Sequence, residues 1–213
     1  TYIHGRSEGM PVRGPFPNPA YPYYYGSNDV DSMYTYLGAL HVYYSTTFGI
    51  NGPNGEGGSA IFPNVAGTIS RGVVHNDYTG FSPTCPYGAQ MSATTGTITF
   101  CRGVVTPDVV GHEYSHTIVE HSFHDSNGHA VGATYYGETG ALNEAYADVM
   151  GEIFEHAYTG TTDWKQGTSP PALGPAIRDL ANPPAMIQAV AGVPYPDRHY
   201  SATVYCGSDD NGG

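Results

Sequence analysis

The stretch that decides both fold and chemistry is His112-Glu113-Tyr114-Ser115-His116, an HExxH motif inside the run VVGHEYSHTIVEH. Thr106-Pro107-Asp108 precedes this run and combines a capping residue, a first-turn proline and an acid suited to a helix N-terminus. We therefore predict a helix that begins here and fades near Ser122. The i, i+4 spacing puts both imidazoles on one face, within reach of a single zinc ion. Glu113 lies beside them, where a glutamate can act on a metal-bound water.

A zinc site on this motif needs a third protein ligand, and the sequence offers two routes to one. In the extended pattern HExxHxxGxxH a glycine and a third histidine follow, but Val119 and Ser122 occupy those positions here. The other route is a glutamate on a second helix, which the sequence predicts over residues 141–158. Glu144 is the candidate ligand there, and Asp148 would hydrogen-bond a ligating histidine. The competing interpretation is two histidines on an ordinary amphipathic helix.

The second predicted helix carries a single acidic stripe at i, i+4, i+8 and i+11, formed by Glu144, Asp148, Glu152 and Glu155. Like charges one turn apart destabilise a helix, and Lys165 is the only lysine in the chain. The stripe therefore predicts cations from outside the chain. Zinc would use its first half, and calcium, which takes several oxygen ligands, would use its second. The alternative is a solvated acidic face.

Composition excludes several classes of protein. The chain has 213 residues with 19 acids against seven bases, for a formal net charge of −12. This balance excludes a nucleic-acid binder that works through a basic face, and it disfavours a polybasic membrane-surface protein. No apolar run approaches the ~20 residues that a membrane span needs. Few charges and 19 tyrosines fit a secreted protein better than a cytosolic one.

The three cysteines support the same compartment. Cys85 and Cys101 flank a stretch rich in Gly, Thr and Ser that predicts a hairpin. A disulfide between them would close a loop of about 15 residues and contribute on the order of 3 kcal/mol. Cys206 has no partner left in the sequence, which indicates a free thiol or a bond to another chain. The alternative is three reduced thiols.

Three segments together resemble the motifs of the thermolysin family of zinc metalloproteases, in the family's order. They are HEYSH, the segment GALNEAYAD at residues 140–148, and DDNGG at residues 209–213. The resemblance runs from about Asp29 to Gly213. It implies that zinc is held by His112, His116 and Glu144, that Glu113 is the general base, and that Asp148 orients His112.

The resemblance also implies how substrate and calcium are bound. Tyr135 would hydrogen-bond the tetrahedral oxyanion, and Arg178 would hold a substrate carbonyl unless it is an ordinary surface arginine. An apolar pocket for the residue after the scissile bond would be lined by Phe100, Val109 and Ile177, which equally fit a plain core. One structural calcium would be bound by Asp108, Glu152, Glu155, Asp163 and the backbone carbonyl of Lys165.

The sequence departs from the family in two regions. The loop after the zinc helix is longer and carries His121, His124, Asp125 and His129, which fit a polar surface loop or a second metal site. The family has a catalytic histidine two residues past DNGG, and the sequence ends at Gly213. We therefore expect a second chain or a C-terminal fragment to complete the helical lobe, with Cys206 as a candidate for a bond to it.

Together these patterns predict an α+β fold in three parts, with a helix near residues 28–48 and short strands between residues 51 and 105. The parts are a β-rich N-terminal lobe over residues 1–106, the zinc helix and its loop over residues 107–136, and the first part of a helical C-terminal lobe over residues 137–213. The expected function is that of a secreted zinc endopeptidase acting on peptides or proteins. The alternatives are a non-catalytic zinc-stabilised binding protein, an inactive protease fragment, or a zinc hydrolase that cleaves another amide.

Overall fold

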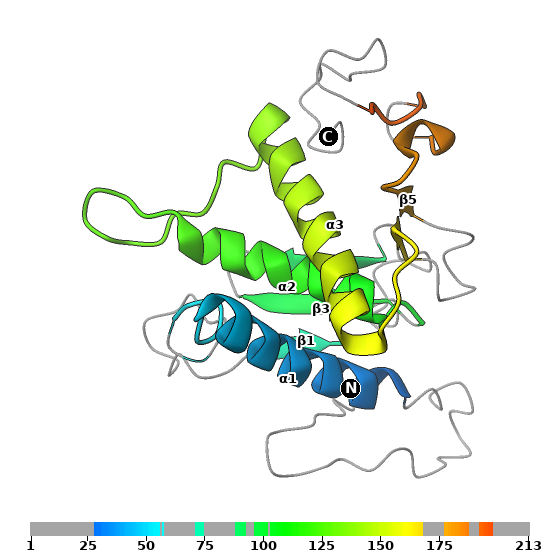
Figure 1. The fold of residues 1–213 in the computed structure, drawn as a ribbon. Helices are drawn as coiled ribbons and strands as arrows, with labels where there is room; N and C mark the ends of the chain where they lie inside the picture. The colour runs from blue at the N-terminus through cyan, green and yellow to red at the C-terminus, as the bar shows by residue number, and fades with distance from the viewer. Residues whose placement is uncertain are drawn as a thin grey trace, which may run out of the picture.

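A computed structural model of the chain describes residues 28–55, 57, 71–74, 88–92, 96–101, 103–167, 177–187 and 192–197. Over these residues the fold is α+β, as predicted, with long helices packed on a small sheet (Figure 1). None of the described helices has both the length and the apolar character needed to cross a bilayer. The lobe boundaries at residues 106 and 136 stay predictions.

The predicted helix near residues 28–48 is confirmed as α1, Asn28–Phe48. Asp29 and Asp31 lie in its first turn, where negative charge favours the helix N-terminus. Gly49 ends the helix in the left-handed region at φ 71°, and its N–H donates to the Ser45 carbonyl at 3.1 Å.

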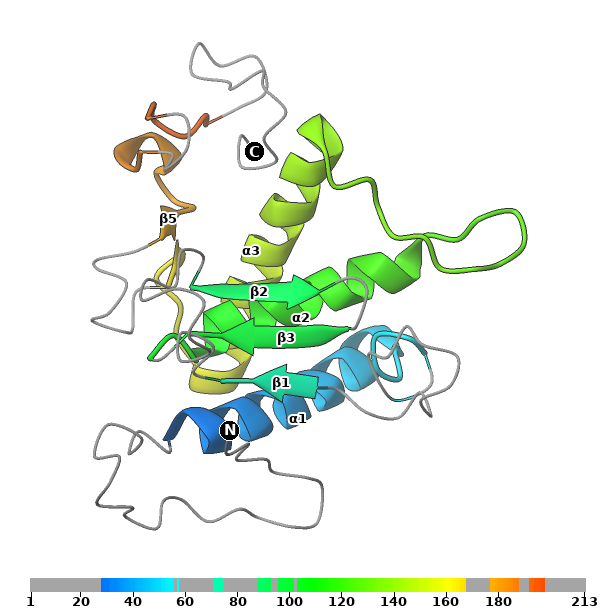
Figure 2. The ribbon, with the colours of Figure 1, turned by 180° about the vertical axis from the view of Figure 1, so that it is seen from behind.

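The sheet has the strand order β1-β3-β2, with β1 at Arg71–Val73, β2 at Ala89–Ser92 and β3 at Thr97–Phe100 (Figure 2). The antiparallel pair β2–β3, with Gln90 opposite Thr99, confirms the predicted hairpin. Strand β1 runs parallel to β3, which the sequence did not predict. A Cβ on Gly72 of β1 would lie 2.9 Å from the Met33 side chain, so this glycine lets α1 lie close against the sheet.

The predicted zinc helix is α2, Pro107–Ser122, and it is buried from Pro107 to Ile118. The sequence predicted Thr106 as the capping residue, but its hydroxyl makes no capping hydrogen bond. This hydroxyl is buried and has no partner among the described residues. Pro107 removes one of the free N–H groups, and the Asp108 carboxylate lies in the first turn, so the helix starts without the threonine cap.

The second predicted helix is α3, Gly137–Thr159, and it begins four residues earlier than residue 141, where apolar periodicity starts. Glu138 in the first turn favours this extension by its charge. Gly160 ends the helix as predicted, at φ 84°, with its N–H donating to the His156 carbonyl at 2.9 Å.

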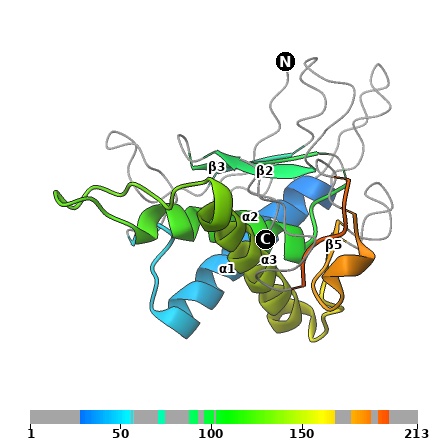
Figure 3. The same ribbon diagram turned by 90° about the horizontal axis from the view of Figure 1, so that it is seen from above.

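Helices α2 and α3 cross with their backbones in close approach at two glycines. A Cβ on Gly111 would lie 3.0 Å from the Gly151 Cα, and a Cβ on Gly151 would lie 2.5 Å from the Asp108 carbonyl. Seen from above, the sheet lies on one side of α2 and α3 lies on the other (Figure 3). The crossing therefore brings polar residues of α3 against the polar face of a buried helix.

Two shorter elements follow α3. Strand β4, Lys165–Gln166, pairs with β5, Arg178–Asp179, in an antiparallel two-stranded sheet, and the 3-10 helix η3 spans Pro183–Ala185. The hydrophobic core lies between α1, the three-stranded sheet, α2 and α3. Its fully buried members include Leu40, Tyr44, Ile98, Phe100, Val104, Val110, Tyr114 and Phe154.

Candidate active site

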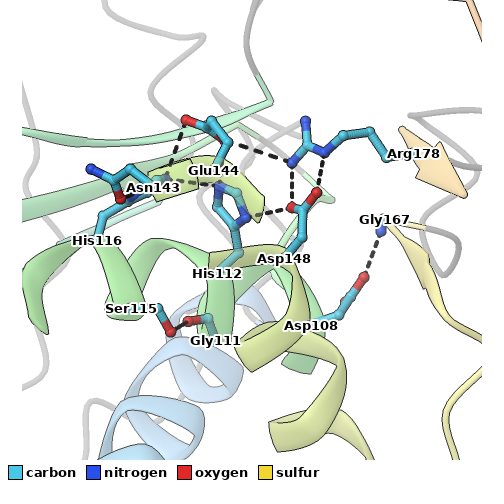
Figure 4. Close-up of polar contacts among 10 residues, drawn as sticks. All are labelled: Asp108, Gly111, His112, Ser115, His116, Asn143, Glu144, Asp148, Gly167 and Arg178. Carbon is cyan, nitrogen blue, oxygen red and sulfur yellow. Dashed lines mark hydrogen bonds and ion pairs between the residues drawn. The ribbon is translucent and has the colours of Figure 1, made fainter. Parts of the chain in front are cut away.

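The crossing of α2 and α3 brings together His112, His116 and Glu144, which we call the histidine cluster (Figure 4). One ligand atom from each lies within 4.8 Å of the others. The two Nε2 atoms are 2.9 Å apart. The Glu144 carboxylate lies 3.3 Å from Nε2 of His112 and 3.5 Å from Nε2 of His116. The three predicted ligands therefore converge on one point.

The outer nitrogen of each imidazole has its own acceptor on α3. His112 Nδ1 lies 2.7 Å from the carboxylate of Asp148, the residue that we expected to contact a ligating histidine. His116 Nδ1 is 2.9 Å from Oδ1 of Asn143, which is 4% exposed. These contacts direct both Nε2 atoms into the cluster. Asn143 was missed by the sequence reasoning, although its place directly before Glu144 in a helix facing α2 is a usable signal.

Arg178 of β5 is part of this network. Its Nε and Nη2 donate to the two oxygens of Asp148 at 2.5 and 2.6 Å, and Nη2 lies 4.0 Å from Glu144. Burial acts to lower the pKa of the guanidinium, but the Asp148 charge outweighs it and raises the pKa. Arg178 is therefore a partly buried, paired arginine and not an ordinary surface one. Its contact with a substrate carbonyl stays a prediction.

Glu113 lies in the same buried region and is 5% exposed. Its Oε2 has no hydrogen-bond partner among the described residues. Burial raises the pKa of this carboxyl to about 7, with the His112 charge acting in the opposite direction. A carboxyl with a pKa near neutrality can both take up and release a proton, which is what a general base requires.

The two imidazoles differ in their affinity for protons. Burial acts to lower the pKa of His112, but its hydrogen bonds to the carboxylates of Asp148 and Glu144 outweigh this effect and raise the pKa to about 10. Burial lowers the pKa of His116 to about 4, and the neighbouring His112 charge acts in the same direction. Without metal at neutral pH, His112 is therefore the charged imidazole of the pair and His116 the neutral one.

The donor set fits zinc on its own chemistry. Two imidazole Nε2 atoms and one carboxylate make a three-ligand catalytic zinc site with an open position. Hydrogen bonds from the outer ring nitrogens to a carboxylate and an amide are the contacts that orient metal-binding histidines.

The predicted substrate-binding residues lie in different surroundings. Tyr135 is 46% exposed, and its ring lies 6.1 Å from that of His116, so it sits beside the histidine cluster. Phe100 and Val109 belong to the hydrophobic core, at 0% and 3% exposed. Ile177 is half-buried next to β5, and its N–H donates to the Gln166 carbonyl. A substrate pocket lined by these three residues stays a prediction.

About two helical turns along α3 from Glu144 lies a second group, Glu152, Glu155 and Asp163, which we call the acidic cluster. Its ligand oxygens lie within 4.8 Å of one another. Glu152 is fully buried, and its Oε1 has no partner among the described residues. Asp108 is 1% exposed and also has one oxygen without a described partner, while the other accepts a hydrogen bond from the Gly167 N–H at 2.5 Å.

Two carboxyls of the acidic cluster, those of Glu152 and Glu155, resist ionisation when no cation is present. Burial, together with the Asp108 charge, raises the pKa of both to about 7. The Thr162 hydroxyl donates to Glu152 and compensates only part of this cost. Convergent carboxylate oxygens with unsatisfied lone pairs fit a calcium ion. A ligand role for the Lys165 carbonyl stays a prediction; the Lys165 N–H donates to Asp163 at 2.9 Å.

Of the predicted cysteine and loop features, the structure describes Cys101 and the long loop after α2. Cys101 is 6% exposed, and Cys85 and Cys206 lie outside the described residues, so the Cys85–Cys101 disulfide stays a prediction. The loop after α2 is exposed from residue 122 to residue 131, and Asp125 orders it by accepting from the N–H groups of Asn127 and His129. Within the described part of the chain its histidines form no group able to hold a metal ion, in keeping with a polar surface loop.

Comparisons with known proteins agree with this geometry. Residues 132–213 match the family model of the thermolysin metallopeptidase α-helical domain. Bacillolysin from Bacillus cereus is 31% identical over 192 residues, which cover 89% of this chain and 29% of that protein. Thermolysin from Alicyclobacillus acidocaldarius subsp. acidocaldarius is 29% identical over 192 residues, covering 89% of this chain and 30% of that protein. The chain thus spans under a third of the length of these relatives.

A solved structure supports the fold independently. The precursor of protealysin, a metalloproteinase from Serratia proteamaculans, matches with a TM-score of 0.64 at 22% identity, covering 98% of this chain and 57% of that one. The helical-domain match and the similarity to relatives over most of the sequence place this chain in the thermolysin family of metallopeptidases.

Proposed function

We propose that the chain is the zinc-binding part of a secreted endopeptidase that hydrolyses peptide bonds with Glu113 as general base. The observation that carries the proposal is Glu113 itself. It is a buried carboxyl beside the histidine cluster, with one oxygen unpaired among the described residues and a pKa of about 7. A purely structural zinc site needs only the ligands, so such a carboxyl favours catalysis over a zinc-stabilised binding protein.

In this mechanism His112, His116 and Glu144 would hold zinc, which when bound polarises a carbonyl and makes water more acidic. Glu113 takes a proton from the attacking water and later passes it to the leaving amine. Tyr135, beside His116, donates a hydrogen bond to the oxyanion. Asp148 and Asn143 keep both imidazoles oriented.

Arg178 has two roles in the proposal. Its paired donors fix Asp148, and through Asp148 they fix the ring of His112. Its remaining donor capacity would hold a carbonyl of the substrate backbone, because a guanidinium presents five N–H donors and Asp148 uses two of them. An apolar pocket with contributions from Phe100, Val109 and Ile177 would receive the residue after the scissile bond.

We also propose one structural calcium ion at the acidic cluster, with Asp108 and the Lys165 carbonyl as further ligands. The unpaired oxygens of Glu152 and Asp108 support it, because a buried carboxylate without a partner is costly. Calcium would neutralise charges that otherwise raise the pKa values of Glu152 and Glu155.

A companion helical segment is part of the same proposal. Leu142, Tyr146 and Val149 of α3 recur at i, i+4 and i+7 and are 70%, 38% and 41% exposed. An exposed apolar stripe of this kind indicates a covering element. We propose that a second chain or C-terminal fragment packs there and completes the helical lobe.

The test is peptide hydrolysis by zinc-loaded, calcium-saturated protein, followed by zinc removal and re-addition. Native and denatured mass spectra would give the bound metals and reveal any companion fragment. We expect hydrolysis that disappears with zinc and returns with it. Hydrolysis that survives complete zinc removal would refute the proposed chemistry, and zinc binding without hydrolysis in material that includes a companion fragment would favour a non-catalytic protein.

A further inference from the structure

On the face of α2 opposite the histidine cluster, two buried hydrogen bonds connect α2 to α1. The Ser115 hydroxyl donates to the Gly111 carbonyl at 2.7 Å, one turn earlier on the same helix. The Tyr44 hydroxyl lies 2.8 Å from the same Ser115 oxygen. Because the Ser115 proton is directed to Gly111, Tyr44 is the donor in this second bond. Both residues are at most 1% exposed, so water does not compete for these bonds.

This chain of bonds acts on the turn that carries both imidazoles. Ser115 directly precedes His116, and Gly111 directly precedes His112, so each member of the Gly111–Ser115 pair lies one residue before a metal-binding histidine. In Figure 4 the two imidazoles point away from α1, whereas Ser115 and Gly111 lie on the α1 side of α2. A contact at this place opposes rotation of the turn about the α2 axis.

The ring contact between α1 and this turn is less directional. The Tyr44 ring is tilted against Tyr114, with the ring centroids 5.4 Å apart. Ring packing of this kind tolerates sliding, whereas a hydrogen bond weakens steeply when its angle changes. Metal–ligand distances must be held to within about 0.2 Å, so a small rotation of the turn would affect zinc before it affected the fold.

We propose that Tyr44 and Ser115 are positioning residues, whose hydrogen bond sets the rotation of α2 and hence the point at which the His112 and His116 Nε2 atoms meet. The inference rests on the proposed zinc site and adds residues from the opposite face of the helix to it. The competing explanation is that the bond only satisfies two buried hydroxyls. A purely structural bond would change stability and leave zinc affinity alone.

The chain offers a matched control in Tyr114, next to Ser115 on the same helix. Tyr114 is fully buried, and its hydroxyl has no partner among the described residues. Tyr114→Phe therefore removes a buried hydroxyl that holds nothing in the described structure, whereas Tyr44→Phe removes one that holds Ser115.

The experiment measures zinc affinity by competition with a chromophoric chelator, the absorption spectrum of the Co²⁺-loaded protein, and the melting temperature without metal. We expect Tyr44→Phe and Ser115→Ala each to lower zinc affinity about tenfold and to shift the Co²⁺ bands. The double variant should lose no more than about the same tenfold, because both changes remove one shared bond. Ser115→Thr, which retains the hydroxyl, should restore the affinity, and Tyr114→Phe should leave it unchanged.

Two results separate the possible failures. If the parent protein binds neither zinc nor Co²⁺, the proposed zinc site fails, and this inference fails with it. If the parent binds zinc and Tyr44→Phe binds it equally well, whatever its melting temperature, only the positioning role is overturned. Tyr44→Phe decides the question even if Ser115→Ala does not fold.

Discussion

The histidine cluster and the acidic cluster lie at the same helix crossing, about two turns apart along α3, yet their side chains have different hydrogen-bond partners. On α2, Asp108 precedes His112 by four residues, and on α3, Asp148 precedes Glu152 by four. Around the histidine cluster, His116 Nδ1 and both oxygens of Asp148 have hydrogen-bond partners within 2.9 Å, and His112 Nδ1 lies 2.7 Å from the Asp148 carboxylate. In and beside the acidic cluster, one buried oxygen of Glu152 and one of Asp108 have no partner among the described residues.

The difference fits the different roles proposed for zinc and calcium at the two clusters. A cluster whose ligands are held by their own hydrogen bonds is organised before the metal arrives, as catalysis requires. At the acidic cluster the pKa values of Glu152 and Glu155 are raised, and one buried Glu152 oxygen has no partner among the described residues, so a bound cation would stabilise these carboxylates. Loss of metal should therefore mainly stop chemistry at the histidine cluster and mainly reduce stability at the acidic cluster.

The largest expected effect is a loss of catalysis without a loss of zinc from the histidine cluster. Glu113→Gln removes the base and no zinc ligand, so zinc should stay bound while peptide hydrolysis falls by a factor of ~10²–10⁴. Hydrolysis rate and zinc content of the same sample give the measurement. Glu120→Gln, a matched change on the same helix at a partly buried residue outside the cluster, should leave both unchanged. Activity of Glu113→Gln within threefold of the parent would rule out the base.

The next effect concerns the acidic cluster. Removing calcium while zinc stays saturating should lower stability by roughly 4 kcal/mol relative to calcium at a thousand times its dissociation constant. Asp163→Ala should produce the same loss and make the protein insensitive to calcium. Asp125→Ala, in the exposed loop after α2, is the control and should retain the calcium response.

The chain provides its own reporter for this measurement. Trp164 is the only tryptophan, follows Asp163 directly and is 41% exposed, so its fluorescence should change as calcium binds. Thermal melts with and without calcium give the stability. An unchanged melting temperature and an unchanged Trp164 signal would mean that the acidic cluster has another partner.

Local patterns in the sequence predicted most of the helices and the three side chains that converge at the histidine cluster. Apolar spacing predicted α1, a cap, proline and acid predicted where α2 starts, and glycines predicted where α1 and α3 stop. The i, i+4 spacing of His112 and His116 and the glutamate on the second helix predicted which side chains converge. These features are local in sequence or involve two elements with strong signals.

What the sequence did not predict depends on contacts between distant segments. The first turn of α3 lacks apolar periodicity, because it extends past the core that marks the rest of the helix. Asn143 gains its role only because α3 crosses α2 where His116 lies. The pairing of Arg178 with Asp148 and the contact of Gly111 with Gly151 are also set by the crossing.

A third prediction tests whether both clusters depend on one crossing. Gly151→Ala would place a Cβ 2.5 Å from the Asp108 carbonyl, which is backbone and cannot move aside cheaply. Separation of the helices should cost about 1–3 kcal/mol in stability and weaken zinc and calcium binding together. Gly38→Ala on α1, where a Cβ meets nothing within 4 Å, is the control and should weaken neither. A loss confined to one metal would show that the two clusters are positioned separately.

The smallest expected effect concerns Asn143, whose side-chain oxygen contacts His116. Asn143→Ala removes the acceptor that orients His116 and leaves the three zinc ligands and the acidic cluster unchanged. A neutral amide that holds one ring should be worth about tenfold in zinc affinity, the lower end for an outer contact of a ligating histidine. Competition titration should show that loss in zinc binding, while the Trp164 response to calcium stays at the parental value. Asn127→Ala, in the exposed loop, tests whether loss of any asparagine has this effect. Equal zinc affinities for Asn143→Ala and the parent would mean that Glu144 and the helix geometry alone orient His116, and that the histidine cluster is less completely organised than its hydrogen bonds indicate.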